Sequence, residues 1–275
     1  MAGDFWAGTH CKEWLMTKEV LLKNRAEDLK YLTEKEYNKF MIFLANVTQN
    51  IGEGMRVPQQ VIATATVYLK RFYSKHSFQD CDPVLMLATC IYTASKVEEY
   101  GPLSNSRLQN VITNSIKKNF SYAWPEFPYN IKQVWECEFY LLEMTDCSLV
   151  VFHPYRCLIN YVHDLNLNDN GEMLRVAWNA VNDSYRTDVS LLYPPHLIAL
   201  TCIHIACVSQ NYENKFVEWI SDLNVSIPTI MEISDMILEM HEIYHTFDQK
   251  AEIEVLLKKI PKPLLSLDKK ESSTK

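Results

Sequence analysis

One short motif in the chain has the spacing of a zinc protease site. His241-Glu242-Ile243-Tyr244-His245 fits H-E-x-x-H, which on a helix places two imidazoles on one face with a glutamate as general base. A zinc protease also needs a third ligand, yet no histidine follows His245, and Glu252 and Glu254 are too close for the usual distant glutamate ligand. We interpret the motif as a helix surface and predict a protein that is not an enzyme and holds no metal or other cofactor.

Two charged residues interrupt apolar helical patterns. Lys96 follows an uncharged run, and Glu138 lies four residues from both Val134 and Leu142. That spacing places the Glu138 carboxylate in the middle of an apolar stripe, where a charge is costly unless it is paired. Lys96 is either a last-turn cation that faces the helix dipole or a partner-binding residue. Glu138 is either an internal ion pair or protonated core acid, or it faces Lys96 and binds a partner helix with it.

A third candidate site combines an aromatic ring with polar groups. Trp178 lies at the edge of the polar face of a predicted helix, one turn before Asn182, and Asp183 follows. A half-buried tryptophan can cover a seam between repeats. It can also line a recognition groove, because tryptophan is enriched in binding hot spots. The residues alone leave both interpretations open.

Composition excludes several classes of protein. The 275 residues are 48% hydrophobic and 22% charged, an ordinary globular balance. The 6 glycines form no phosphate-binding loop. A net charge of -7 argues against direct nucleic-acid binding, because proteins that bind through phosphates are normally basic.

Three further patterns bear on compartment. The chain begins without a basic region followed by an apolar core, so we expect no secretion signal. The uncharged stretch from Val189 to Tyr212 contains Pro194-Pro195 and is predicted to be a buried helix and not a membrane span. The 8 cysteines include no C-x-x-C pair and are predicted to be reduced thiols.

Helix signals dominate the chain. Thr33-x-x-Glu36 is a capping box, and proline stands at the first turn of several apolar-periodic segments. One N-terminal helix is predicted from about Cys11 to Leu29. A tail rich in lysine, proline and serine, from about Lys258, is predicted to be disordered.

An internal repeat relates two of the helical segments. A shift of 112 positions places Pro83–Ser95 on Pro195–Cys207, with six of the thirteen residues identical. Each copy is apolar nearly all round and must be surrounded by other helices. The sequence therefore predicts an all-α fold of two compact units. The counterpart of Lys96 is Val208, so the fold as such does not require lysine there.

Seven segments of the chain carry a family resemblance: Ala63–Tyr73, Asp82-Pro83, Ala94–Glu99, Trp135–Glu143, His153–Arg156, Asn182–Asp188 and Leu192–Pro195. They resemble the cyclin family, and within it the cyclins of the Mediator kinase module. The resemblance runs from Phe5-Trp6 to about Lys262. It implies two tandem five-helix cyclin folds with an extra N-terminal helix. The expected divisions are an N-terminal helix in 1–34, a first cyclin box in 35–148, a second repeat in 149–257 and a disordered tail in 258–275.

The resemblance also implies roles for the candidate residues. The implied kinase-binding residues are Lys96, Glu138, Glu99, Trp6 and Trp14. The implied residues of a groove for a second partner, a subunit of the Mediator kinase module, are Trp178, Asn182 and Asp183.

The functional expectation follows from the resemblance. We expect a nuclear regulatory subunit that activates a cyclin-dependent kinase of the Mediator kinase module and so regulates RNA polymerase II transcription, as activator or repressor. It would contact neither nucleic acid nor membrane directly. The alternatives are another transcriptional cyclin, with an elongation or activating kinase as partner, or a DNA-binding general transcription factor with a cyclin fold.

Overall fold

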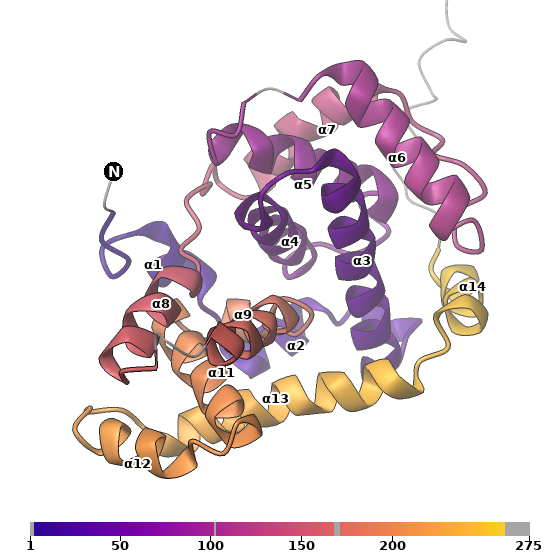
Figure 1. Ribbon diagram of the computed structural model, residues 1–275. Coiled ribbons are helices and arrows are strands. Elements are labelled where there is room, and N and C mark those ends of the chain that lie inside the picture. Colours follow the sequence, from indigo (N-terminus) through magenta and orange to yellow (C-terminus); the bar gives the residue numbers. More distant parts are fainter. Residues whose placement is uncertain (1–2, 102, 168–170, 262–275) are drawn as a thin grey trace, which may run out of the picture. The chain divides into compact units, whose positions relative to one another are not determined.

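The computed structural model describes residues 3–101, 103–167 and 171–261. Regular secondary structure in these ranges is helical throughout (Figure 1). The chain divides into two compact units. We call Thr17–Val150 with Phe247–Lys275 the first-repeat unit, and Met1–Met16 with Val151–Thr246 the second-repeat unit.

The first-repeat unit is built around one apolar helix, α5, which packs against α3, α4 and α7 (Figure 1). Asp82 caps α5 by accepting a hydrogen bond from the Val84 amide at 3.0 Å, and Pro83 occupies its first turn. Within α5 only Tyr92, Lys96 and Val97 are not buried. The five helices of this repeat are α3 (Glu34–Met55), α4 (Gln59–Tyr73), α5 (Pro83–Val97), α6 (Asn105–Asn119) and α7 (Ile131–Met144).

The second-repeat unit has the same plan around α11, which contacts α8, α9, α12 and α13. The start and the end of α11 both lie 112 positions after those of α5, which confirms the predicted repeat. This unit has five longer helices, as expected, and the short α10 in addition. No helix in the described ranges is long and apolar enough to span a membrane. The helices here are α8 (Tyr155–Asp164), α9 (Gly171–Ser184), the short α10 (Val189–Leu192), α11 (Pro195–Ser209), α12 (Glu213–Ser221) and α13 (Ile227–Thr246).

The N-terminal segment differs from the single helix expected over Cys11 to Leu29. It forms α1 (Thr9–Trp14), α2 (Lys18–Asn24) and a 3-10 turn, η1 (Asp28–Lys30). The helix breaks at Leu15, whose backbone is extended, and the Thr17 hydroxyl then caps α2 by accepting from the Val20 amide at 3.4 Å. A threonine cap inside an amphipathic pattern restarts the helix.

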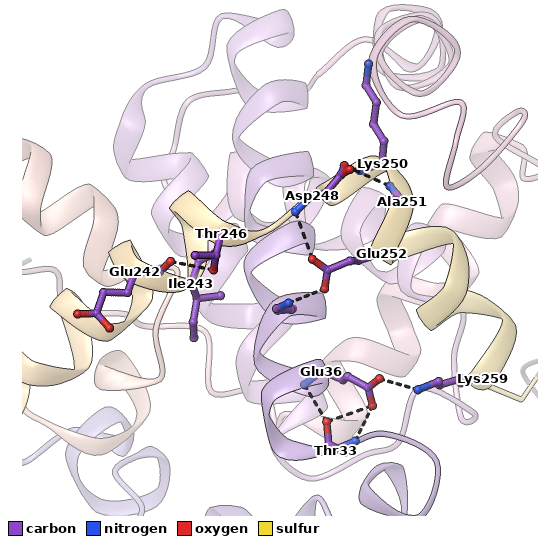
Figure 2. Close-up of polar contacts among 11 residues, drawn as sticks. Thr33, Glu36, Glu242, Ile243, Thr246, Asp248, Lys250, Ala251, Glu252 and Lys259 are labelled. Carbon is purple, nitrogen blue, oxygen red and sulfur yellow. Dashed lines mark hydrogen bonds and ion pairs between the residues drawn. The ribbon is translucent and has the colours of Figure 1, made fainter.

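The last described helix, α14 (Gln249–Lys259), packs against α3, although the sequence assigned residues up to 257 to the second repeat. Lys259 reaches Glu36 of the α3 capping box at 2.5 Å, as Figure 2 shows. Lys39 and Glu252 form a second ion pair between these helices. Lys258 and Lys259 therefore complete a helix, and residues 262–275 of the expected tail lie outside the described residues.

Candidate functional site

Lys96 and Glu138 form an ion pair between the last turn of α5 and the middle of α7. The ammonium of Lys96 lies 2.6 Å from Oε2 of Glu138, and the Thr93 hydroxyl donates to Oε1 at 2.8 Å. Glu138 is 8% exposed, so each carboxylate oxygen has the partner that a buried charge requires. The Lys96 side chain is 39% exposed and keeps donors available to a binding partner.

The two predicted charges therefore meet, and they do so as the internal ion pair that was one of the two interpretations of Glu138. The Lys96–Glu138 ion pair is also compatible with partner binding, because the buried carboxylate fixes the position of the exposed ammonium. Tyr92 adds a second constraint, since the Lys96 ammonium lies 4.6 Å from the centre of its ring.

Helix α7 also carries an exposed aromatic ring. Phe139 directly follows Glu138 and is 73% exposed. We did not predict it as a site residue. The sequence does contain a signal for an exposed aromatic residue. Phe139 lies three residues after Glu136 and four before Glu143, which places its ring on the polar face of α7. Exposed aromatic side chains next to a fixed charge are typical of binding surfaces.

Glu99 lies two residues after the end of α5 and is exposed, with a left-handed backbone at φ 54°. Its carboxylate takes no part in the Lys96–Glu138 ion pair. The preceding Glu98 is structural instead, since its carboxylate accepts hydrogen bonds from Thr64 and Gln60, each at 2.5 Å. Of the two glutamates, Glu99 is the one with a free surface for a partner.

The two N-terminal tryptophans have opposite surroundings. Trp6 is 61% exposed, with its ring 5.6 Å from that of His196. Trp14 is 1% exposed. The side chain of Trp14 therefore has no surface to offer a kinase, and its role is to hold the segment that carries Trp6. His10 contributes to this, because its Nδ1 accepts from the Phe152 amide at 3.0 Å.

The groove candidates separate into two clusters within the second-repeat unit. The half-buried ring of Trp178 lies 4.6 Å from the ring of Tyr155, tilted by 30° against it. The Tyr155 hydroxyl donates to Oδ1 of Asn182 at 2.8 Å, which leaves the Asn182 amide protons for a ligand. Trp178, Tyr155 and Asn182 thus form one surface with a flat aromatic part and a hydrogen-bond donor.

Asp183 belongs to the other cluster. Its carboxylate accepts from Arg186 at 2.6 Å and lies 3.0 Å from Nε2 of His241. It links α9 to α13 and is not available to a groove ligand. The same contact pairs His241, the first histidine of the H-E-x-x-H motif, with Asp183. Among the described residues, no group of three or more potential metal ligands occurs.

All eight cysteines, each within the described ranges, are free thiols. Burial raises the pKa of Cys202 on α11 above its ordinary value, as expected for a thiol in an apolar core. Its burial supports the prediction that Cys202 is a structural thiol of the core.

Two protein families match the chain. Residues 14–150 match the family described as "Cyclin, N-terminal domain", and residues 153–246 match "Cyclin C-terminal domain". The chain therefore belongs to the cyclin family.

Within that family the chain is similar to cyclin C proteins. It is 49% identical to Cyclin-C of Rattus norvegicus over 264 residues, which cover 96% of this chain and 92% of the relative. It is 48% identical to Cyclin-C of Drosophila melanogaster, with 96% and 98% covered. The predicted resemblance is confirmed.

Two solved complexes contain chains with the same fold. The yeast TFIIK (Kin28/Ccl1/Tfb3) complex matches with a TM-score of 0.68 at 23% identity, covering 84% of this chain and 99% of the other. The CAK complex of Chaetomium thermophilum matches with a TM-score of 0.71 at 19% identity, covering 93% and 87%.

Proposed function

We propose that this cyclin binds and activates a cyclin-dependent kinase of the Mediator kinase module in the nucleus, and so regulates RNA polymerase II transcription without catalysis of its own. The observation that carries the proposal is the Lys96–Glu138 pair, in which a buried carboxylate holds a half-exposed ammonium. The similarity to Cyclin-C proteins over nearly the whole chain supports the kind of kinase.

The cyclin would act by selecting one conformation of its partner. A kinase is active when the glutamate of its regulatory helix pairs with the lysine that positions ATP. A partner that binds only this arrangement shifts the population towards it. Lys96 would donate to backbone carbonyls of the kinase at a regulatory helix, and Phe139 would bury its ring against the apolar surface next to that helix.

The second-repeat unit would recruit another subunit of the kinase module. Trp178, packed against Tyr155, offers an apolar platform, and the Asn182 amide offers donors of fixed orientation. A peptide segment with an apolar side chain and an adjacent backbone carbonyl fits this chemistry. Asp183 would support the site by holding α9 in place.

A direct test compares kinases. Purified kinase domains of the Mediator, elongation and activating types are titrated with the cyclin in a calorimeter, and activity on a peptide substrate is measured in parallel. The proposal expects tight binding and activation with the Mediator type. Preference for another type would favour the alternative transcriptional cyclin, and binding to DNA in place of any kinase would favour the general transcription factor.

A further inference from the structure

Two buried thiols from different segments meet in the core of the first-repeat unit. Cys81 directly precedes Asp82, the cap of α5, and Cys137 lies in the middle of α7. Their sulfur atoms are 3.8 Å apart, and the two residues are 4% and 5% exposed. A disulfide requires about 2.05 Å between the sulfurs, so an approach of about 1.8 Å would close the bond.

The backbone near Cys81 is held so that the thiol stays at this place. The Tyr73 hydroxyl donates to the Cys81 carbonyl at 3.0 Å, and the Tyr129 hydroxyl donates to the neighbouring Asp82 at 2.8 Å. By contrast, Cys90 is fully buried in α5 without a sulfur in hydrogen-bonding contact. The contact is therefore particular to Cys81 and Cys137.

The two thiols are chemically unequal. Their contact lowers the pKa of Cys137 against the effect of burial, and the same contact, together with burial, raises the pKa of Cys81. Because the two sulfurs touch, either one can react with an oxidant as a thiolate, and the other is then the resolving thiol.

A hollow lies next to the segment that contains Cys81. Phe78, Asp82 and Pro83 on either side of it line a hollow of about 110 Å³, together with Trp124 and Leu257. That volume holds several molecules of the size of water, and hydrogen peroxide is little larger.

We propose that Cys81 and Cys137 are an oxidation site that hydrogen peroxide converts to a disulfide, and that this crosslink weakens the binding of the kinase. The thiolate of one cysteine attacks one peroxide oxygen, the O–O bond breaks, and the leaving hydroxide takes up the thiol proton as water. The other cysteine then attacks the sulfenic sulfur, the S–S bond forms, and the sulfenic oxygen leaves as a second water with the proton of the second thiol. The two thiols lose two electrons, and a dithiol reductant restores them.

The effect on the kinase rests on the proposed function, through the position of Glu138. This residue follows Cys137 in α7, and its carboxylate is held by Lys96 at 2.6 Å and Thr93 at 2.8 Å. Hydrogen bonds of this kind tolerate changes of only a few tenths of an ångström in the donor–acceptor distance. A crosslink that draws the Cys137 sulfur towards Cys81 therefore displaces the carboxylate that fixes Lys96.

The test uses the full chain, treated with hydrogen peroxide and then blocked with a thiol reagent. Mass spectrometry of the intact protein and its peptides should show a loss of about 2 Da and a peptide pair joined through Cys81 and Cys137. Calorimetry with the kinase domain should show at least a tenfold weaker affinity, which dithiothreitol restores. Cys81→Ala and the bulkier Cys81→Val should resist both changes, whereas Cys147→Ser, at an exposed thiol, should behave as wild type.

The outcomes separate the two proposals. Absence of the Cys81–Cys137 peptide pair in folded, oxidised protein would overturn the oxidation site, whatever the kinase does. A quantitative crosslink with unchanged affinity would overturn its effect on the kinase. Failure of the reduced wild-type protein to bind any kinase would instead count against the proposed function, and the crosslink result would be unaffected.

Discussion

The ammonium of Lys96 and the carboxylate of Glu138 lie 2.6 Å apart across α5 and α7, with the lysine half-exposed and the glutamate buried. Each residue therefore stabilises the other in the free protein. The repeat suggested that Lys96 is dispensable for the fold, because Val208 occupies the same place in the second copy. The structure modifies that expectation, since removal of Lys96 leaves the buried carboxylate with Thr93 as its remaining hydrogen-bond partner.

Glu138→Gln should weaken kinase binding and lower stability modestly. The amide can still accept from Thr93, but it loses the charge that fixes Lys96. Loss of one partner of a charged hydrogen bond costs about 1.5–3 kcal/mol at most sites, and the partial exposure of Lys96 places this pair at or below the lower end. Urea unfolding together with calorimetry on the kinase domain measures both effects. Unchanged affinity in a folded variant would remove Glu138 from the kinase contact.

The groove makes a different prediction. Trp178→Ala with Asn182→Ala should weaken a second Mediator kinase-module subunit about tenfold or more, because an aromatic anchor and a donor are both lost. Kinase affinity should stay at the wild-type value. A pull-down with purified subunit and kinase compares the two partners. If the kinase is lost equally, these residues contribute to packing and not to a groove.

Asp183 is the matched control for that groove. Asp183→Asn should lower the free energy of unfolding by about 1 kcal/mol, because the carboxylate that joins Arg186 and His241 loses its charge. Binding of the second subunit should change little. Selective loss of that subunit without loss of stability would return Asp183 to the groove.

Much of the fold follows from the sequence, because the signals act locally. The capping box at Thr33, the first-turn proline at Pro83 and the repeat that relates it to Pro195 set helix bounds that the structure confirms. The N-terminal break was missed because the Thr17 cap lies inside an amphipathic run. The docking of α14 was missed because the ion pair of Lys259 with Glu36 joins residues far apart in the chain.

Part of the candidate site could also be predicted from local signals in the sequence. A charge in an apolar stripe signalled Glu138, and helical spacing joined Trp178 to Asn182. Helical spacing also grouped Asp183 with them, yet its side chain points to a different helix and meets His241. The sulfur contact of Cys81 and Cys137 depends on how α7 packs against the start of α5, which no local pattern contains.

Stability should fall as the pH drops from about 7 to 5. Burial lowers the pKa of His204 on α11, and the same cause lowers the pKa values of His76 and His196. Below the unfolded value near 6.5 the unfolded chain binds more protons than the native state, so the free energy of unfolding decreases. His204→Phe should make this dependence shallower. His163→Asn, at a side chain that is 75% exposed, is the control, and equal slopes in all three proteins would contradict the assignment.

The most direct test of the account is the affinity of the purified Mediator-type kinase domain for Lys96→Ala, measured by calorimetry beside the wild type. Removing one side of an interfacial charge contact typically costs about 2–5 kcal/mol, and about 1.4 kcal/mol is tenfold. We expect Lys96→Ala to cause at least a tenfold loss of affinity and a parallel loss of kinase activation. The double variant with Glu138→Gln should lose less than the sum of the two single losses, because both residues serve one contact. Wild-type affinity in a folded Lys96→Ala protein would contradict the central claim.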